Sequence, residues 1–300
     1  MFLSNKPKIS YVVIAYNRAT YINECIDSIL AQDIKKEIIC IDDCSTDGTY
    51  EILKKYSEEY KEIKLFKNDK NMGTVYSRTK GISKCSGEYM LFVDSDDRVL
   101  GDHSALYKQA KATYADILEF SCETDGDENL KNSLRRSDNH IERDLLSSYQ
   151  SKVISNQLWN KLTSRKIYKK VIKLVDVDIS HANFSDVVFF MYHFIMNSEK
   201  FVSTSQVGYF YYDNRGMTAN MGYIDRLKEY CRYKITKQEL ESIYGKMDEL
   251  KLIWNYVCNQ AVDCYLHLSK QEQRDNKHLL YELMSKKNAD FLINARSANK

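Results

Sequence analysis

Hydrophobic and polar positions follow a repeated order along the first hundred residues. A run rich in β-branched residues from Ile9 to Ala15 predicts a buried strand. The segment after it, which Thr20 is suited to cap, has apolar residues at helical spacing. These residues are Tyr21, Ile22, Cys25, Ile26, Ile29 and Leu30. The chain therefore opens with a strand followed by an amphipathic helix.

The same order recurs up to residue 93. Further strands are predicted at residues 37–43, 63–66 and 89–93, with helices at residues 50–60 and 74–85 between them. Strands separated by single helices pair in parallel, because each helix carries the chain back to the start of the next strand, and such crossovers are right-handed. The pattern predicts an α/β fold with a mostly parallel central sheet flanked by helices.

Polar residues gather where these strands end. Tyr16 and Asn17 follow the first strand, two aspartates at positions 42–43 close the second, and Asp94 and Asp96 follow the fourth. Ligands bind beyond the carboxyl ends of parallel strands, so these clusters are expected at one edge of the sheet. Asp94 and Asp96 share a face of extended chain, where a divalent cation can join a carboxylate to a diphosphate. An acidic turn is the simpler alternative for two aspartates at a strand end.

The pattern is weaker in the following hundred residues. The elements predicted there are helices at residues 103–113 and 183–196 and strands at residues 115–121 and 201–212. Residues 123–140 are polar and aperiodic, which indicates a long loop. Between residues 145 and 175 the sequences NQLWNKL and IYKKVIKL indicate short helical pieces.

The character of the sequence changes after residue 223, where an apolar stripe appears at helical spacing. Its members are Leu240, Ile243, Met247, Leu250, Trp254, Val257, Cys258 and Ala261. The stripe predicts a packing face, either within a helical subdomain at residues 221–300 or against a second copy of the chain in a homodimer. A membrane-surface helix is a third reading, which the acidic residues between the lysines disfavour.

Composition narrows the class of protein. The chain has 300 residues, enough for a large core, and its formal net charge of +2 gives no reason to expect a nucleic-acid partner. Its eight cysteines lie mostly in apolar segments and fit free thiols of a reducing compartment. The N-terminal segment lacks the apolar core of a signal peptide, and the longest apolar run, residues 187–196, is far shorter than the ~20 residues that span a bilayer. We expect a cytoplasmic location, with peripheral contact at the inner membrane left open.

Three segments together resemble a known family. KISYVVIAYNR, IICIDDCSTDGT and NMGTVYSRTKGISKCSGEYMLFVDSDD are similar in residue type, order and spacing to the nucleotide-sugar half of family-two glycosyltransferases. The resemblance implies the GT-A fold, with a Rossmann-like sheet in a domain at residues 1–220. Residues 1–100 would form its nucleotide-sugar half and residues 101–220 its acceptor half, followed by a helical extension at residues 221–300.

The resemblance also implies a donor site. Tyr16 would lie near the base, and Asp43 would accept a hydrogen bond from N3 of uracil, which favours a UDP-sugar. Asp96, with Asp94, would bind the Mn²⁺ or Mg²⁺ ion that bridges the diphosphate. The donor-binding residues implied are Tyr16, Asn17, Asp43, Arg78, Asp94, Ser95 and Arg215.

On the acceptor side, the family is generally inverting, so one carboxylate removes the proton of the attacking hydroxyl. NFSDVVFF resembles the family's helix-opening acidic pair, with Ser185 in place of Glu, and this makes Asp186 the expected base. A helix-stabilising aspartate is the alternative. Trp159 and Lys161 resemble a W-x-K segment that borders the acceptor, and His193 falls on the helical face of Asp186. Burial in the core is the alternative for Trp159 and His193.

The implied activity is metal-dependent, inverting transfer of a single sugar to a hydroxyl of a bacterial surface glycan, either free or lipid-linked. Capsule, lipooligosaccharide and O-antigen are the glycan classes expected. The alternative is a catalytically inactive module of the same fold that binds a glycan or a partner, because fold does not guarantee activity. Asn214 and Arg215 stand where some relatives have a histidine, so the third metal ligand stays undetermined.

Overall fold

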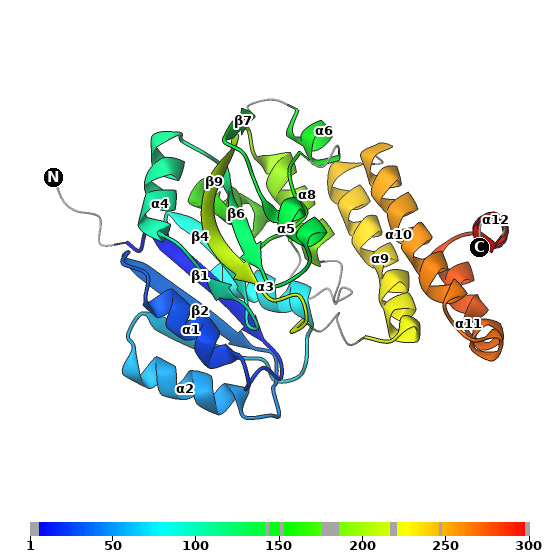
Figure 1. The fold of residues 1–300 in the computed structure, drawn as a ribbon, viewed down its shortest axis with the longest axis horizontal. Coiled ribbons are helices and arrows are strands. Elements are labelled where there is room, and N and C mark those ends of the chain that lie inside the picture. The colour runs from blue at the N-terminus through cyan, green and yellow to red at the C-terminus, as the bar shows by residue number, and fades with distance from the viewer. Residues whose placement is uncertain are drawn as a thin grey trace. The chain divides into compact units, whose positions relative to one another are not determined.

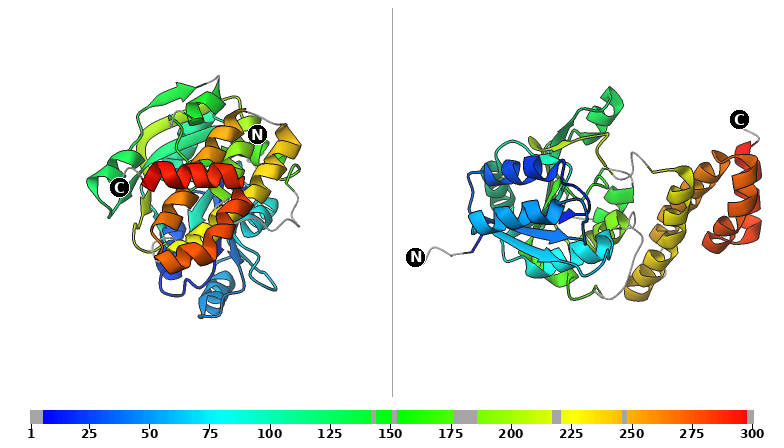
Figure 2. Two further views of the ribbon diagram at one scale, coloured as in Figure 1. Left: turned by 90° about the vertical axis from the view of Figure 1, so that its right-hand side faces the viewer. Right: turned by 90° about the horizontal axis from the view of Figure 1, so that it is seen from below.

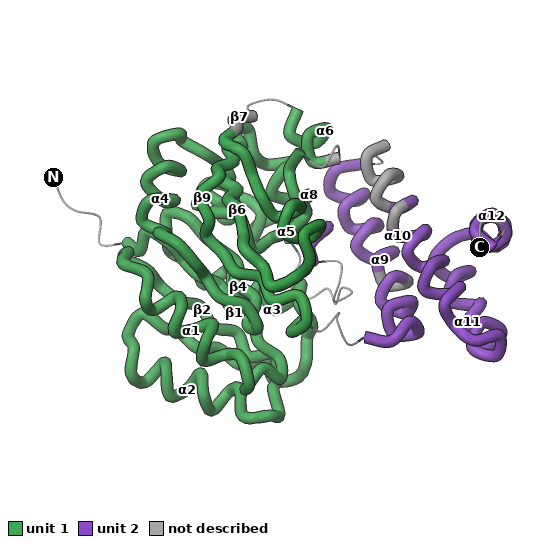
Figure 3. The backbone as a smooth tube through the Cα atoms, viewed as in Figure 1, with its two compact units in different colours: residues 1–179, 190–216 green, residues 180–189, 217–300 purple. Residues whose placement is uncertain are grey.

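The chain folds as two compact units, residues 1–179 with 190–216 and residues 180–189 with 217–300 (Figure 3). The structure is a computed structural model that describes residues 6–141, 144–150, 153–175, 186–216, 221–245 and 248–297. Each unit has its own hydrophobic core. The helix α8 (Asp186–Asn197) contributes its first four residues to the second unit and the remainder to the first.

The first unit is built on one sheet. Its described strands run in the order β3-β2-β1-β4-β8-β6-β9-β5, and β7 pairs with β9. The strands are β1 (Ile9–Ala15), β2 (Lys36–Asp42), β3 (Ile63–Lys67), β4 (Tyr89–Asp94), β5 (Arg98–Val99), β6 (Ile117–Thr124), β7 (Asn139–Ile141), β8 (Lys161–Ser164) and β9 (Phe201–Tyr211). The long pairings, among β1 to β4 and between β6 and β9, are parallel. The antiparallel pairings of β5, β7 and β8 are only two or three residues long, so the predicted mostly parallel sheet is confirmed.

Helices cover both faces of this sheet (Figure 1). They are α1 (Ile22–Leu30), α2 (Thr49–Glu59), α3 (Thr74–Lys84), α4 (His103–Ala112), α5 (Glu128–Leu134), α6 (Leu145–Gln150), α7 (Arg165–Val171) and α8. Helix α3 packs directly on β1, because a Cβ atom at Gly81 would lie only 2.4 Å from Cγ1 of Val12. The apolar side chains of α1 and α4 instead join the core on the opposite face, with those of Tyr11 and Val13.

The strand order reverses after β3. The chain moves outward from β1 to β2 and β3, and then α3 returns it past β1 to β4. With right-handed crossovers, this reversal places α3 on the face opposite α1 and α2. The point between β1 and β4, where the order changes direction, is the place at which open α/β sheets bind ligands.

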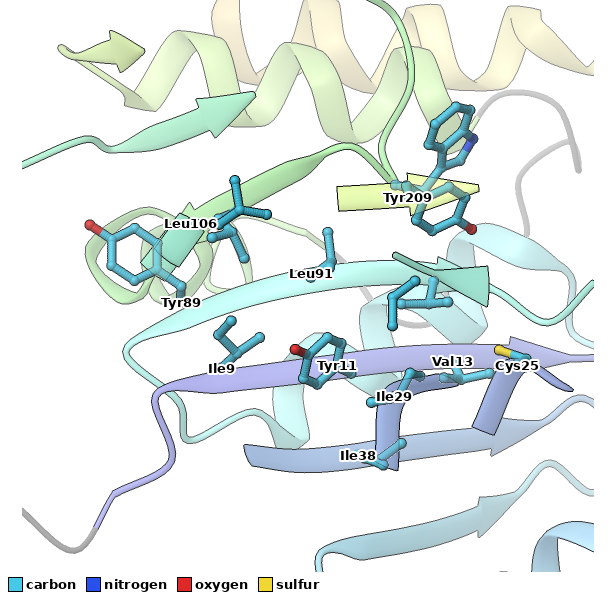
Figure 4. Close-up of a cluster of buried hydrophobic side chains, with 14 of the residues drawn as sticks. Ile9, Tyr11, Val13, Cys25, Ile29, Ile38, Tyr89, Leu91, Leu106 and Tyr209 are labelled. Carbon is cyan, nitrogen blue, oxygen red and sulfur yellow. The ribbon is translucent and has the colours of Figure 1, made fainter. Parts of the chain in front are cut away.

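The core between the sheet and helices α1 and α4 is aromatic and aliphatic (Figure 4). In the close-up, Ile9 and Tyr11 of β1 and Leu91 of β4 point to one face of the sheet. His103 is buried there, with Nδ1 2.8 Å from the hydroxyl of Tyr11 and Nε2 2.8 Å from the carbonyl oxygen of Gly208. Burial lowers the pKa of His103 to about 4, so the ring is neutral at pH 7.

Two expectations for the middle of the chain were wrong. The segment NQLWNKL does not form a helix, since its end is the start of the four-residue strand β8, which lies between β4 and β6. A four-residue strand is too short to show the alternation of apolar and polar residues by which strands are predicted. Residues 123–140 are not one long loop, because they contain α5, which Asp127 caps through the amide of Leu130, and the start of β7. Helix α5 buries Leu134 alone, so its sequence lacks a helical stripe.

The second unit continues through α9 (Tyr223–Tyr244), α10 (Asp248–Leu266), α11 (Lys270–Leu283) and α12 (Lys286–Ser297), which are yellow to red in Figure 2. Leu240, Val257 and Ala261 of the predicted stripe are buried in this unit. The helical extension expected after residue 220 is therefore helical in its described parts. No helix within the described ranges has the length and hydrophobicity that a membrane crossing needs.

Candidate active site

Three loops meet at the carboxyl edge of β1, β2 and β4. Ala15 is in register with Asp42, and Ile14 is in register with Asp94, so the three strands end at the same level. The chain segments that follow them therefore lie next to one another, as the parallel pattern predicted. Tyr16 is half-buried in the first of these segments, and Ser95 is buried in the third.

The loops after β1 and β2 are joined through Asn17. Its backbone has φ 53°, a left-handed conformation that asparagine tolerates better than most residues. The Asn17 amide donates to the hydroxyl of Ser45 at 3.0 Å, and its side-chain oxygen accepts from the amide of Thr46 at 2.9 Å. The amide of Arg18 donates to the hydroxyl of Thr49 at 2.7 Å. Asn17 thus links the loop after β1 to the loop after β2.

Asp43 holds the loop between β3 and α3. Its Oδ1 accepts hydrogen bonds from the side chain of Asn68 at 2.7 Å and the amide of Met72 at 2.8 Å, and its Oδ2 accepts from the amide of Gly73 at 2.8 Å. A carboxylate offers about four acceptor positions, so these three bonds leave Oδ2 able to accept one more. Asp43 is 5% exposed. It holds the loop through three hydrogen bonds, and Oδ2 can still accept a hydrogen bond from a ligand.

Asp94 and Arg78 form the central ion pair of the site. Arg78 Nη2 lies 2.7 Å from Asp94 Oδ1, and the guanidinium group stacks over the ring of Phe92 at 4.7 Å. The arginine side chain is 6% exposed whereas that of Asp94 is 29% exposed. The pair therefore presents its carboxylate, and not its cation, to solvent.

Asp96 and Asp97 complete an acidic turn. Arg18 Nε lies 3.4 Å from Asp96 Oδ2. Burial, followed by the charge of Asp94, raises the pKa of Asp96. The same two causes raise the pKa of Asp97 to about 9. Burial is the larger cause for both carboxyl groups and the charge of Asp94 adds to it, so the turn holds neighbouring carboxylates whose charge a bound cation would offset.

The acidic turn fits a magnesium or manganese ion only in a shared site. No group of three or more His, Cys, Asp or Glu side chains suited to a metal occurs among the residues that the structure describes. Mg²⁺ in nucleotide sites commonly takes one or two protein carboxylates and completes its shell with phosphate oxygens and water. Asp94 and Asp96 supply carboxylates of that kind.

Arg215 lies at the rim of the same site. Its Nη1 is 2.6 Å from Glu24 Oε2, and its guanidinium group stacks over the ring of Tyr212 at 3.3 Å. The hydroxyl of Tyr212 donates to the other oxygen of Glu24. Burial acts to raise the pKa of Glu24, but the hydrogen bonds from Tyr212 and Arg215 outweigh it and hold that pKa below its usual value. The amide of Tyr212, three residues before Arg215, donates to Asp97 Oδ1 at 2.9 Å, so this segment lies beside the acidic turn.

A comparison with family models identifies the family. The model described as Glycosyl transferase family 2 matches residues 10–172, more than half of the chain. The chain belongs to glycosyl transferase family 2. This confirms the resemblance that the three sequence segments carried.

Curated glycosyltransferases match part of the chain. A cholesterol galactosyltransferase of Borreliella burgdorferi is 42% identical over 116 residues, which are 38% of this chain and 32% of the relative. A poly(ribitol-phosphate) beta-glucosyltransferase of Bacillus spizizenii is 40% identical over 116 residues, which are 37% of this chain and 18% of the relative. The chain thus matches a third or less of the length of these two relatives.

Solved structures show the fold of the family 2 chain. S. aureus TarS 1-349 in complex with UDP has a TM-score of 0.63 at 19% identity, over 95% of this chain and 83% of that chain. A mannosyltransferase of Pyrobaculum calidifontis in complex with GDP-Man and Mn²⁺ has a TM-score of 0.52 at 16% identity, over 99% of this chain and 77% of that chain. The expected GT-A fold is confirmed.

The residues expected near the acceptor of this family 2 protein lie in well-packed surroundings. Trp159 is 7% exposed. Lys161 is 2% exposed and its Nζ lies 3.0 Å from Glu119 Oε1. His193 is completely buried in α8. Asp186 is the first residue of α8, where its Oδ1 accepts from the amide of Val187 at 2.9 Å, and it belongs to the second unit. Ser185 lies outside the described residues.

Three residues of the site were missed from the sequence. Arg18 directly follows Tyr16 and Asn17, which the sequence analysis assigned to the site. Its position in the same loop could therefore have indicated it. Glu24 lies in the first turn of α1, where an acidic residue normally indicates helix stabilisation. Tyr209 lies within β9 and has no sequence signal of its own, because a buried strand tyrosine is expected from packing alone.

Proposed function

We propose that this protein is an inverting, metal-dependent glycosyltransferase that moves a single sugar from a UDP-sugar to a hydroxyl of a bacterial surface glycan. The observation that carries the proposal is the set of carboxylates at the point between β1 and β4, with Asp94 and Asp96 beside a loop held by Asp43. A nucleoside diphosphate needs a place for its base and a cation near its phosphates, and we assign both to this edge of the sheet, where parallel α/β sheets bind ligands.

The donor nucleotide binds along this edge in the proposed function. The ring of Tyr16 stacks on the uracil, and the remaining acceptor direction of Asp43 Oδ2 takes the N3 hydrogen, which cytosine does not have. Arg78 orients the carboxylate of Asp94 toward the ribose through their 2.7 Å ion pair. Asn17, in the loop after β1, and Ser95, in the turn after β4, lie beside the nucleotide in this proposal. Arg215 reaches the diphosphate from the rim when it exchanges its bond to Glu24.

The divalent cation, Mn²⁺ or Mg²⁺, would be held by Asp96 and Asp94. When bound, it supplies Lewis-acid stabilisation of the charge that develops on the departing UDP. The closeness of two carboxylates in one turn supports this assignment, since the charge of Asp94 adds to burial in raising the pKa of Asp96. Arg18, which faces Asp96, balances part of that charge in the absence of nucleotide.

Asp186 is the proposed general base. Inversion requires the acceptor hydroxyl to attack the anomeric carbon on the side opposite UDP while a carboxylate removes its proton. Asp186 opens a buried helix, where the helix N-terminus favours the ionised carboxylate that a base needs. Trp159, Lys161 and His193 are buried, so in this proposal they support the acceptor side of the site from the interior and do not touch the acceptor themselves.

The acceptor class is proposed from the relatives. The B. spizizenii relative is named as acting on poly(ribitol-phosphate), and the TarS structures include complexes with UDP and UDP-GlcNAc. These names support a surface polymer as acceptor and UDP as the donor nucleotide. A lipid-linked glycan fits equally well, since its sugar presents the same hydroxyl chemistry.

The first test is a screen of UDP-, GDP- and CMP-sugars for Mn²⁺-dependent hydrolysis, in which released nucleotide is measured and Asp96→Ala serves as the blank. We expect slow release from one UDP-sugar and none in the variant, because water replaces the acceptor at a low rate. Absence of release from every donor, together with absence of UDP binding in calorimetry, would contradict the proposal and favour an inactive binding module.

Asp186→Asn separates the base from the donor site. We expect UDP affinity to stay within about twofold of wild type, and transfer to fall by about 10²- to 10⁴-fold, the usual contribution of a general base. Asp102→Asn is the matched control, since Asp102 caps α4 through the amides of Ser104 and Ala105 and lies outside the proposed machinery. Transfer by Asp186→Asn at more than a tenth of the wild-type rate would remove Asp186 as the base.

A further inference from the structure

The hydroxyl group of Tyr209 is bonded on both sides to the acidic turn. The amide of Asp94 donates to the Tyr209 hydroxyl oxygen at 3.0 Å, and the hydroxyl donates to Asp97 Oδ2 at 3.0 Å. Tyr209 is completely buried. A single side chain from β9 therefore connects the first and last aspartates of the turn, 115 and 112 residues away in the sequence.

This contact replaces a missing part of the sheet. Strand β8 pairs with β4 only at Tyr89 and Met90, so the end of β4 extends beyond its antiparallel neighbour. An amide at such a position needs another acceptor, because a buried backbone donor left without one is costly. The Tyr209 hydroxyl supplies that acceptor to Asp94. The direction in which the β4 end points is thereby set by β9.

A second bond fixes the far end of the turn. Asp97 Oδ1 accepts from the amide of Tyr212 at 2.9 Å, and the chain then enters β5, which pairs with β9 through Arg98 and Val99. The two oxygens of Asp97 are thus both engaged by residues of β9 and the segment after it. Asp97 attaches the turn to the sheet, while Asp94 and Asp96 remain available to the donor.

An aromatic stack holds Tyr209 itself in place. The indole of Trp159 lies parallel to the ring of Tyr209, with centroids 4.6 Å apart and an interplanar angle of 17°. It also stacks on Tyr211, with centroids 5.3 Å apart and an angle of 4°. A buried tyrosine ring in such a stack cannot rotate away from its hydroxyl partners without losing packing on both faces.

We propose that Tyr209 is a positioning residue of the donor site, which holds Asp94 and Asp96 at the separation that a shared cation and diphosphate require, with Trp159 as the support for its ring. The inference rests on the proposed function for its ligand and on the hydrogen bonds and ring stacking of Tyr209 for its geometry. It gives the W-x-K segment a role in the donor site, in addition to the acceptor role that the resemblance implied.

Tyr209→Phe tests the inference, because it removes the hydroxyl and keeps the ring. We expect hydrogen exchange at the amides of residues 94–97 in the nucleotide-free protein to become about tenfold faster, since Asp94 loses its acceptor. We also expect the affinity for Mn²⁺ in the presence of UDP, measured by loss of the free Mn²⁺ signal in electron paramagnetic resonance, to fall about five- to tenfold.

Tyr11→Phe is the matched control. Tyr11 is also a completely buried tyrosine of this sheet, and its hydroxyl is bonded to His103, away from the turn. We expect a comparable fall in Tm in both variants, with unchanged exchange at residues 94–97 and unchanged Mn²⁺ affinity in Tyr11→Phe. Equal exchange and equal affinity in the two variants would overturn the inference, because the hydroxyl of Tyr209 would then be only structural.

One outcome distinguishes failure of the proposed function from failure of the inference, and a second variant covers the case in which Tyr209→Phe does not fold. If wild type binds no Mn²⁺ with UDP, yet Tyr209→Phe alone speeds exchange at residues 94–97, the proposed function fails and the positioning of the turn stands. If Tyr209→Phe does not fold, Trp159→Phe replaces it, because the smaller ring loosens the stack and leaves the hydroxyl present. Unchanged exchange and affinity in Trp159→Phe would then overturn the inference.

Discussion

Two carboxylate-cation pairs of the same unit differ in their surroundings. Arg78 and Asp94, at the carboxyl edge of the sheet, leave the carboxylate 29% exposed. Lys161 and Glu119, in the interior between β6 and β8, have side chains that are 1% and 0% exposed. Arg136 Nε also lies 3.3 Å from Glu119 Oε2, and Ser155 and Asn160 donate further hydrogen bonds to this carboxylate.

The difference in exposure between the two pairs indicates which carboxylate can bind a ligand. A buried pair has exchanged water for fixed partners, so the loss of one partner leaves a charge that nothing else can solvate. The exposed carboxylate of Asp94 keeps access to water and can exchange that water for a cation. Burial acts to lower the pKa of Lys161 while Glu119 acts to raise it, and burial prevails. The interior pair links β6 to β8, and the edge pair keeps a carboxylate that solvent reaches.

Lys161→Met should show the largest effect, and it is an effect on stability. The variant leaves Glu119 buried with only Arg136 as a cationic partner, and we expect the free energy of unfolding to fall by about 3 kcal/mol, at the low end for a broken buried pair. Urea denaturation followed by circular dichroism measures it.

Lys166→Met is the control for this variant. Lys166 is 58% exposed and faces Asp116 at 3.5 Å, so it repeats the same chemistry at the surface. We expect it to cost about 1 kcal/mol or less. A loss in Lys161→Met no greater than in the control would mean that the interior pair is not what separates the two regions.

Unlike Lys161→Met, Asp96→Ala should weaken ligand binding and leave stability nearly unchanged. We expect Mn²⁺-dependent UDP binding to weaken by at least about tenfold, or about 1.4 kcal/mol, because a carboxylate proposed for the cation is lost. We expect Tm to stay within about 2 °C of wild type or to rise, since the raised pKa of Asp96 means that its charge is disfavoured in the folded state. Calorimetry and thermal denaturation measure the two quantities.

Asp69→Ala controls for the loss of one negative charge, because Asp69 is exposed in the loop between β3 and α3 that Asp43 holds. We expect it to change neither UDP binding nor Tm. Equal weakening in both variants would assign the effect to overall charge and not to a site at Asp96.

His103 gives the smallest of these effects, and it again belongs to the interior. Its pKa of about 4 in the folded state lies below the ordinary value of 6.5, so the unfolded chain takes up a proton first as pH falls. The contribution of His103 to stability is complete above pH 6.5 and is lost as pH falls toward 4. Between pH 6.5 and pH 5.5 we expect the stability advantage of wild type over His103→Gln to shrink by about 1 kcal/mol.

Tyr11→Phe separates this titration from simple loss of packing. It removes the hydroxyl bonded to Nδ1 of His103 and leaves the imidazole in place. We expect a lower stability at every pH, with the wild-type dependence on pH retained. If His103→Gln retains that dependence as well, another group is responsible for it.

The first hundred residues could be predicted almost completely. Strands β1 to β4 are buried runs separated by single helices, and this arrangement leaves little freedom in their order or direction. The edge at which Tyr16, Asp43 and Asp94 meet follows from the parallel pairing alone. The family resemblance then added roles to these residues, and the family match at residues 10–172 agrees with it.

The remaining features depend on contacts that the sequence does not encode locally. Strand β8 has four residues and is held by its neighbours, so its existence follows from the sheet and not from its own pattern. The pairs of Arg18 with Asp96 and of Glu24 with Arg215 join distant segments. A single sequence offers no periodicity that brings such residues together, and both pairs were accordingly missed.

The bond between Glu24 and Arg215 spans 191 residues of sequence and has a consequence for synthesis on the ribosome. The first helix and Arg98, whose Nε lies 3.7 Å from Glu24 Oε1, emerge early, yet the closer partner of Glu24, Arg215, emerges only after β9 has been translated. Contacts of such long range are formed late in folding, because the intervening chain must first be ordered. A nascent chain that ends at residue 172 has the strands of the nucleotide half and lacks Tyr209, Tyr212 and Arg215. Such a chain has the parallel strands of a donor site before it has the residues that hold the acidic turn in place.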